Sequence, residues 1–384
     1  MLTCQKSLFN LPDDIHYLNC AYMSPLSRPV EEAGIRGMSA KRVPSDIVVD
    51  DFFEPSDRLR GLFARLINAP DASRIAIIPA ASYGIATAAR NTQVRAGQNV
   101  VIVGEQFPGN VYEWRSLCAR EGLELRSVAA PDLRERRGAV WNERLLRAID
   151  ADTAAVSLGN VHWTDGTRFD VAAVGERARE VGAALVVDGT QSVGAMPFDV
   201  QELRPDALIA AGYKWMLGPY SVGCAWYGPR YDEGIPLEET WIAREGSEDF
   251  RRLVDYQDAY QPGAVRYDVG ERSNFILVPM LVAALELILD WSPAGIQEYC
   301  AALTRDLIGE ARELGYSVED DAWRGSHILG LRAPPGRDLA KLQPELERRG
   351  VRVSLRGSAM RVAPNVYNDE ADIGALIDAL RQTR

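Results

Sequence analysis

Short apolar runs alternate with amphipathic stretches through the first two thirds of the chain. Seven runs consist mainly of β-branched or small apolar residues and span at most five positions each: Arg74–Ile78, Asn99–Val103, Leu125–Val128, Ala154–Leu158, Ala184–Val187, Ala207–Ala210 and Gly223–Tyr227. Such runs, separated by stretches with helical periodicity, predict strands of a mostly parallel sheet that is buried on both faces. Ligands of such a sheet gather beyond the carboxyl ends of its strands. Polar residues at those ends are therefore candidates for a site.

After residue 270 the pattern is mixed. It predicts helices over Asn274–Trp291, Ala294–Leu314, Asp338–Arg349 and Asp369–Arg384, and strands over His327–Leu331 and Val351–Leu355. Residues 15–22, near the start of the chain, are typical of extended backbone that crosses near a domain junction. We therefore predict an α/β fold with a large domain at residues 21–270 and a smaller α+β domain at residues 271–384, alongside which residues 1–20 pack.

The composition is that of an ordinary globular protein. Of 384 residues, 47% are hydrophobic and 25% are charged, and the net charge of −11 argues against a nucleic-acid partner. The five cysteines are scattered and odd in number, which favours a reducing compartment and argues against a disulfide framework or a metal site. The N-terminus lacks an apolar signal segment, and the most apolar stretch, Phe275–Leu285, is too short to cross a bilayer. We expect a cytoplasmic protein with no membrane partner.

The most informative residues are Asp188 and Lys214. Asp188 closes a predicted strand, and Lys214 stands alone in the apolar segment Ala-Gly-Tyr-Lys-Trp-Met-Leu-Gly-Pro. Each has an ordinary explanation, because lone lysines are usually solvated and a strand-end aspartate often begins a turn. Together they match pyridoxal 5′-phosphate (PLP) chemistry, in which a lysine amine forms an imine with the cofactor aldehyde and a carboxylate keeps the ring nitrogen protonated. Burial would also lower the pKa of the lysine amine and make it a better nucleophile.

A phosphate site is predicted where the strand ending at Ile78 gives way to a helix. The segment Pro-Ala-Ala-Ser-Tyr-Gly opens an alanine-rich stretch, and the first backbone N–H groups of a helix attract an anion. Ser82 could add a hydroxyl donor to that site. The alternative is that Ser82 caps the helix and holds no ligand.

Further residues suit the same chemistry. Phe107 and Asn160 both follow predicted strands, where an aromatic ring could cover a planar cofactor and an amide could bind its ring hydroxyl. Arg361 carries a planar guanidinium that binds carboxylates through two bonds, which suits an amino-acid substrate. Taken singly, Phe107 is explained as a core side chain and Arg361 as a surface residue at the start of an edge strand. His162 is interpreted as structural.

In this order the motifs resemble the class V aminotransferases, a family of fold-type I PLP enzymes. The family includes cysteine desulfurases, selenocysteine lyases, kynureninases and isopenicillin N epimerase-like proteins. The resemblance covers nearly the whole chain and is most specific over residues 188–218. It implies a homodimer whose active sites form at the subunit interface.

The same resemblance implies a role for each candidate residue. Lys214 would carry the Schiff base, and Asp188 would pair with the pyridine nitrogen. Gln191 and Asn160 would face the ring oxygen, and Phe107 would stack on the ring. Ala81, Ser82 and Tyr213 would bind the phosphate, and Arg361 would bind the substrate carboxylate. Ser273 or Asn274 would reach the phosphate site of the partner subunit.

Two departures from the desulfurases narrow the function. Desulfurases of this kind carry a cysteine on a loop shortly before the carboxylate-binding arginine, but residues 353–360 contain none. Tyr213 replaces the histidine that usually precedes the lysine, which is closer to the kynureninase arrangement. We expect an enzyme acting on an amino acid as an aminotransferase or a C–S or C–Se lyase, without a persulfide-forming cysteine.

Several alternatives stay open. They are a cysteine desulfurase or selenocysteine lyase, a kynureninase-like hydrolase, an epimerase, and an inactive binding protein that keeps the PLP fold. The presence of Lys214, Asp188 and Arg361 argues against an inactive protein. An unrelated nucleotide enzyme is disfavoured, because no Gly-x-Gly-x-x-Gly follows the first strand and no Gly-Lys-Ser/Thr loop occurs.

Overall fold

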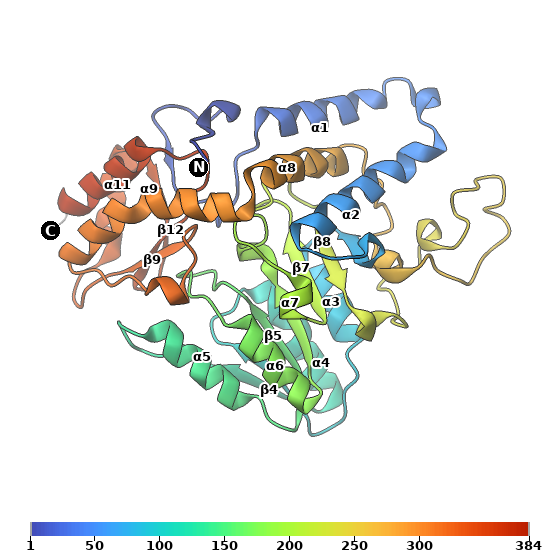
Figure 1. The fold of residues 1–384 in the computed structure, drawn as a ribbon, viewed down its shortest axis with the longest axis horizontal. Coiled ribbons are helices and arrows are strands. Elements are labelled where there is room, and N and C mark those ends of the chain that lie inside the picture. The colour runs from blue at the N-terminus through green and yellow to red at the C-terminus, as the bar shows by residue number, and fades with distance from the viewer. Residues whose placement is uncertain (1, 383–384) are drawn as a thin grey trace.

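A computed structural model describes residues 2–382 and is organised around one large sheet (Figure 1). The sheet contains β2 (Ile75–Ile78), β3 (Asn99–Val103), β4 (Glu124–Val128), β5 (Thr153–Gly159), β6 (Ala184–Asp188), β7 (Ala207–Ala211) and β8 (Gly223–Tyr227). Its strand order is β2-β8-β7-β6-β5-β3-β4, and β8 runs antiparallel to both of its neighbours while the other pairs are parallel. All seven predicted strands therefore form, and the predicted mostly parallel α/β sheet is confirmed.

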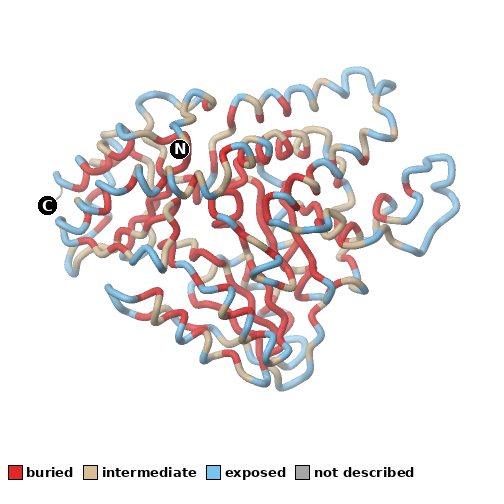
Figure 2. Tube along the Cα trace, viewed as in Figure 1, coloured by how far each residue is buried: buried red, intermediate tan, exposed pale blue. Residues whose placement is uncertain are grey.

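Two apolar cores cover the two faces of this sheet. Successive residues of one strand face opposite sides, so Ile77 and Val101 join the core beneath α2, α5, α6 and α8, while Ile78 and Val100 join the core beneath α3 and α4. These helices are α2 (Glu54–Leu66), α3 (Ala81–Arg90), α4 (Tyr112–Glu121), α5 (Arg137–Ala148), α6 (Val171–Val181) and α8 (Leu277–Trp291). Apart from the edge strand β4, in which only Val128 is buried, the strands are almost continuously buried (Figure 2). Burial of each large aliphatic side chain contributes about 1.5–3 kcal/mol and fixes the sheet as a rigid base.

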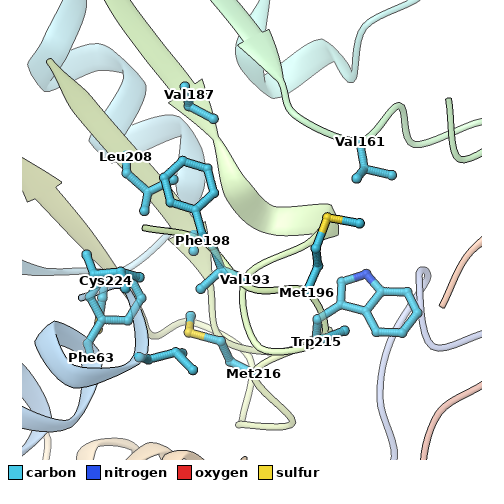
Figure 3. Packing of buried hydrophobic residues seen from close by; sticks show 14 of the residues in the cluster. Phe63, Val161, Val187, Val193, Met196, Phe198, Leu208, Trp215, Met216 and Cys224 are labelled. Atoms are coloured by element: carbon cyan, nitrogen blue, oxygen red, sulfur yellow. The ribbon is translucent and has the colours of Figure 1, made fainter. Parts of the chain in front are cut away.

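The first core also holds the loops that carry the candidate residues. Val193, Met196 and Phe198, which follow β6, pack together with Trp215 and Met216, which follow β7 (Figure 3). The loops beyond the carboxyl ends of these strands are therefore anchored by buried apolar side chains.

The C-terminal part forms a smaller unit with its own apolar core. Its antiparallel sheet has the order β11-β12-β9, and a parallel pair joins β1 to β10. The elements are β1 (His16–Tyr17), β9 (Leu329–Arg332), β10 (Val351–Arg352), β11 (Ser354–Arg356), β12 (Ala359–Val362), α9 (Pro293–Glu313), α10 (Gln343–Arg348) and α11 (Glu370–Gln382). The last two residues of the predicted terminal helix lie outside the described residues. The apolar residues of α8 belong to the core of the large sheet, so the division at residues 270 and 271 stays a prediction.

Two further α-helices lie around the large sheet. They are α1 (Arg28–Ala40) and the short α7 (Val200–Leu203). The helix α8 lies against α1 and α2 (Figure 1). Within residues 2–382 no single helix is long and apolar enough to cross a membrane, and α8 and α9 meet the criteria of length and composition only as a pair that bends by 69°.

Candidate active site

A cavity of about 440 Å³ lies where the carboxyl ends of the parallel strands meet. Its walls come from the segments that follow β2, β3, β5, β6 and β7 and from the turn that precedes β8. Candidate residues in its lining are Ala81, Ser82, Phe107, Asp188, Gln191, Tyr213 and Lys214. Chain segments far apart in sequence thus meet at one edge of the sheet, as the pattern predicted.

A second cavity of about 300 Å³ adjoins the first. The two share five lining residues, namely Phe107, Trp163, Tyr213, Lys214 and Tyr220. The second cavity adds Arg356 and Arg361 from the small sheet and Tyr22 from the N-terminal segment. Lys214 therefore lies at the junction of two compartments with different chemistry.

The loop that carries Lys214 is fixed from several sides. Its neighbours Trp215 and Met216 are fully buried, and the Trp215 indole N–H donates to Gln191 Oε1 at 2.9 Å. The backbone of Gly194 has a φ of +102°, and a Cβ there would lie 2.2 Å from the Trp215 carbonyl oxygen. Glycine at that position therefore allows the close approach that presses the lysine loop against the loop after β6.

The Lys214 amine is desolvated but unpaired. The residue is 6% exposed, and its Nζ makes no hydrogen bond or ion pair with any residue that the structure describes. Its neighbours are the rings of Phe107, at 5.2 Å from Nζ to the centroid, and Tyr213, at 5.4 Å. Burial lowers the pKa of Lys214 to about 8, while the negative charge of Asp188 opposes the decrease and Arg361 adds to it. About a tenth of this amine is therefore neutral and nucleophilic at pH 7, far more than for a solvated lysine.

Asp188 ends β6 and faces the same cavity. One carboxylate oxygen accepts the Thr190 backbone N–H at 3.0 Å, which fixes the side chain at the start of the following turn. Burial raises the pKa of Asp188, while the hydrogen bonds from Thr190 and the charge of Lys214 act in the opposite direction. The carboxylate thus forms no ion pair within the described chain and remains available to a cationic ring nitrogen.

The start of α3 lies in the wall of the first cavity, at the predicted phosphate site. Ala81 and Ser82 occupy the first two helical positions, where backbone N–H groups have no partner within the helix. The N-cap residue, Ala80, offers no side-chain cap, and Ser82 is exposed on the cavity side. The alternative in which Ser82 caps the helix is therefore not what the structure shows.

Aromatic rings surround the lysine. Phe107 is 43% exposed and packs edge-on against Trp163, with ring centroids 5.5 Å apart. Tyr213 lies against Tyr220, with centroids 4.6 Å apart. Phe107 is therefore not a core side chain, since a large part of its ring is free to cover a planar ligand.

Arg361 is a buried cation that forms no ion pair with any carboxylate among residues 2–382. It is 1% exposed and lies on β12, the middle strand of the small sheet, rather than on an edge strand. Its Nη1 donates to the Trp163 carbonyl oxygen at 2.6 Å, and its Nη2 donates to Asn19 Oδ1 at 3.2 Å and Ser354 Oγ at 3.3 Å. Burial lowers the pKa of Arg361 to about 10. Neutral oxygens thus orient the guanidinium and leave its charge uncompensated.

Two of the predicted amides are already engaged. Gln191 lines the cavity, but its Nε2 donates to the Ala21 carbonyl oxygen at 3.1 Å and its Oε1 accepts from Trp215. Asn160 does not line either cavity, and its Oδ1 accepts the Ser192 hydroxyl at 2.5 Å. The structure therefore gives both amides a role in holding the loops, and their contact with a ring oxygen stays a prediction.

Ser273 and Asn274 lie outside the two cavities. The Ser273 hydroxyl donates to the Phe52 carbonyl oxygen at 2.6 Å, and Asn274 Oδ1 accepts the backbone N–H groups of Ile276 and Leu277 at 3.1 and 2.8 Å. Both line a separate surface hollow beside α1. That Ser273 or Asn274 reaches the phosphate site of a partner subunit stays a prediction.

His162 lines the first cavity with both ring nitrogens engaged, whereas the cysteines of the described chain lie outside both cavities. His162 contacts Thr164 Oγ1 at 2.8 Å and the Gly104 carbonyl oxygen at 3.2 Å, which engages both ring nitrogens. None of the five cysteines lines either cavity of the described chain. Cys20 comes nearest, with its Sγ 3.8 Å from the Lys214 carbonyl oxygen, and burial raises the pKa of its thiol to about 11. A thiolate is therefore disfavoured at that position.

The sequence analysis did not identify several lining residues, among them Tyr22, Trp163, Tyr220 and Arg356. Trp163 follows β5 by four positions, so the strand-end rule could have identified it. Arg356 lies on a two-strand hairpin whose pairing the sequence did not reveal.

This set of residues fits a planar, phosphorylated aldehyde cofactor. The unpaired Lys214 amine, the Asp188 carboxylate, the free N–H groups of α3 and the exposed Phe107 ring all face one cavity. No group of three potential metal ligands occurs among residues 2–382.

Comparisons with known proteins agree with this geometry. The family model for class-V aminotransferases matches residues 50–306. The isopenicillin N epimerase of Streptomyces clavuligerus is 25% identical over 377 residues, which cover 94% of this chain and 93% of the epimerase. The uncharacterized aminotransferase YcbU of Bacillus subtilis is 26% identical over 329 residues, which cover 85% and 83% of the two chains. A cysteine desulfurase of Shigella sonnei is 32% identical over 174 residues, which cover 44% of this chain and 41% of the desulfurase.

Solved structures show the same fold. A mutant of C-DES with glycine covalently linked to its PLP cofactor superposes with a TM-score of 0.87, 17% identity and full coverage of both chains. The apo cysteine desulfurase of Thermococcus onnurineus gives a TM-score of 0.83 at 17% identity and covers 100% of this chain and 98% of its own. The chain therefore belongs to the class-V aminotransferase family of PLP-dependent enzymes, as its motifs predicted.

Proposed function

We propose that this enzyme acts on a free α-amino acid as an aminotransferase or as a lyase that releases its product directly. The observation that carries the proposal is the pair of unpaired, buried cations at the two cavities. Lys214 faces Asp188 in the first cavity, and Arg361 lines the second. An amine beside a carboxylate suits the cofactor, and a guanidinium one compartment away suits a substrate carboxylate.

In this proposal the first cavity holds PLP. Lys214 would hold the cofactor through its amine, and Asp188 would pair with the pyridine nitrogen. Ala81 and Ser82 would donate to the phosphate, and Phe107 would cover one face of the ring. When bound, PLP withdraws electrons from the bonds of the substrate α-carbon.

Lys214 also moves the proton. When its amine is not bound to the cofactor, its Nζ would lie in the cavity wall, where burial lowers its pKa to about 8. An amine with such a pKa is a suitable base toward the α-carbon and can return the proton to a different atom. Transamination and elimination both begin with this step.

Arg361 orients the substrate by its α-carboxylate. Its guanidinium is already aligned by Trp163, Asn19 and Ser354, so little side-chain entropy is lost on binding. A carboxylate there would also supply the missing counter-charge. A substrate bound in this way would have its amino group near Lys214, since both residues line the second cavity.

The absence of a cysteine from both linings supports direct product release. A sulfur-accepting thiolate must reach the substrate, and the described cavities contain none. Ser354 and Ser358 occupy the hairpin before Arg361 instead.

We further propose that the enzyme is a homodimer. The apolar side chains Ile35 and Met38 of α1 are 58% and 60% exposed, and they lie on the helix beside the hollow that contains Ser273 and Asn274. In a homodimer, the partner subunit would cover these exposed apolar side chains and remove them from water. Analytical ultracentrifugation checks this, and a monomeric holoenzyme would contradict it.

A spectral titration of the holoenzyme tests the proposed function. The wild type should change its cofactor absorbance with amino acids, and Lys214→Ala should lose both the native cofactor spectrum and turnover. Keto acid with the amine form of the cofactor would indicate transamination, whereas a released fragment with recovery of the starting spectrum would indicate a lyase. A Lys214→Ala protein with unaltered spectrum and turnover would refute the assignment.

A further inference from the structure

Two arginines share one face of the hairpin formed by β11 and β12. Ser354 pairs with Arg361, and Arg356 pairs with Ala359 in the antiparallel register. Residues directly opposite each other, and residues two positions apart on one strand, point to the same side of a sheet. Arg356 and Arg361 therefore project to the same side, and both line the second cavity.

Neither guanidinium has a counter-charge. No carboxylate lies within ion-pair distance of Arg356 or Arg361 anywhere in the described chain. Arg356 Nη1 donates a hydrogen bond to a neutral group, the Leu355 carbonyl oxygen, at 3.1 Å. The Nε atoms of both arginines are buried without a hydrogen-bond partner. Two like charges thus face one compartment, and Arg356 contributes to the lowered pKa of Arg361.

Trp163 contacts both arginines through different groups. Its carbonyl oxygen accepts Arg361 Nη1, and the centre of the Arg356 guanidinium lies 5.5 Å from the centroid of its ring. The indole N–H donates to the Glu105 carbonyl oxygen at 2.7 Å, which fixes the ring. Each guanidinium therefore has its own support, and the pair is preorganised as two separate anion-binding groups.

We propose that Arg356 binds a second anionic group, carried on the side chain of the substrate, so that the enzyme acts on acidic amino acids. This inference rests on the proposed function, in which Arg361 binds the α-carboxylate. A monocarboxylic substrate would neutralise Arg361 and leave Arg356 uncompensated beside it. A dicarboxylic amino acid would neutralise both arginines. A substrate without the second carboxylate would leave the Arg356 guanidinium without an anionic partner in the cavity, and it would therefore bind much more weakly.

Matched ligand pairs test this inference. Glutamate and glutamine, and aspartate and asparagine, differ in side-chain charge at nearly constant shape. The holoenzyme is titrated with each ligand while cofactor absorbance is followed, in the wild type and in the variants Arg356→Gln and Arg356→Lys. Arg352→Gln is the control, because Arg352 lies on the neighbouring strand β10 and lines neither cavity.

In the wild type and in Arg352→Gln, at least one acid should bind about 10- to 100-fold more tightly than its amide, as expected for one charged hydrogen-bonding partner. Arg356→Gln should reduce that preference to less than about 3-fold while glutamine or asparagine binds as before, and Arg356→Lys should retain part of it. A purely structural role for Arg356 would weaken acid and amide alike.

Three results would overturn the inference alone. They are equal binding of acids and amides by the wild type, an unchanged preference in Arg356→Gln, and an equal loss for both members of each pair. If no amino acid perturbed the cofactor spectrum of the wild type, the proposed function would fail and this inference with it.

Discussion

The buried Lys214 amine should lower the free energy of unfolding of the cofactor-free protein, and the substitution Lys214→Met should raise it. The amine is 6% exposed and has no hydrogen-bond or ion-pair partner in the described chain. Burial lowers its pKa from 10.5 to about 8. A difference of this size between the folded and unfolded states corresponds to about 3 kcal/mol, at 1.36 kcal/mol for each factor of ten. Methionine keeps most of the length of the side chain and removes the charge.

The sign of the pH dependence follows from the lowered pKa. Below pH 8 the amine is protonated in both states, so the folded protein carries the full cost of the buried charge. Between pH 8 and 10.5 the unfolded chain binds more protons than the folded one, and wild-type stability therefore rises with pH. Above pH 10.5 the amine is neutral in both states, and the cost disappears.

Urea denaturation of the cofactor-free proteins between pH 6.5 and 10.5 measures this effect. The stability advantage of Lys214→Met over the wild type should shrink by about 3 kcal/mol across the range. Lys341→Met, at an exposed position, should differ from the wild type by no more than about 0.5 kcal/mol. A constant difference for Lys214→Met at all pH values would show that the amine is not desolvated, and a less stable variant at pH 6.5 would refute the reasoning.

Three other substitutions separate catalysis from stability. Asp188→Asn should lower turnover by at least about 100-fold with little loss of unfolding free energy, because burial already raises the pKa of Asp188 and a neutral amide suits that site; near-normal turnover would contradict its role. Arg361→Ala should raise the apparent dissociation constant for amino acids by about 10- to 100-fold while cofactor loading is retained, and unchanged affinity in a spectral titration would place the carboxylate elsewhere. Asp268→Ala should cost about 3–5 kcal/mol in urea denaturation, because Asp268 is fully buried and pairs with the buried Arg60 and Arg272; a loss below about 1 kcal/mol would show that water reaches the cluster.

The sequence predicted the large sheet well for a physical reason. Strands buried on both faces must be mainly apolar, so most of the seven stood out as continuous runs. The exception is the edge strand β4, which contains Glu124, Arg126 and Ser127 and in which only Val128 is buried. The small sheet lacked this signal. The predicted strand at Val351–Leu355 changes partner within its length, because residues 351–352 pair with β1 and residues 354–356 pair with β12. The strand β12 appeared only as the edge strand in the alternative explanation of Arg361, since this arginine interrupts its short apolar pattern.

The candidate site was predictable where chemistry dictates the residue type. Lys214 and Asp188 stood out because an apolar environment makes a lone charge conspicuous, and the structure brings both to one cavity. Gln191 and Asn160 show the limit of this reasoning. Their amides are used by Trp215, Ala21 and Ser192, and such contacts depend on tertiary packing that no local pattern encodes.

The charge balance of the site explains why its cations are held by neutral groups. Asp188 is the sole carboxylate in the described lining of the two cavities, which contains Lys214, Arg356 and Arg361. A carboxylate beside Arg361 would orient it equally well but would compete with every anionic ligand. The carbonyl, amide and hydroxyl oxygens that surround it orient the guanidinium and leave its charge available to a ligand. The chain as a whole carries a net charge of −11, so this local excess of positive charge contrasts with the rest of the surface and favours the entry of anions. The site therefore stores an electrostatic cost in the free protein that a phosphorylated cofactor and a carboxylate substrate each reduce on binding.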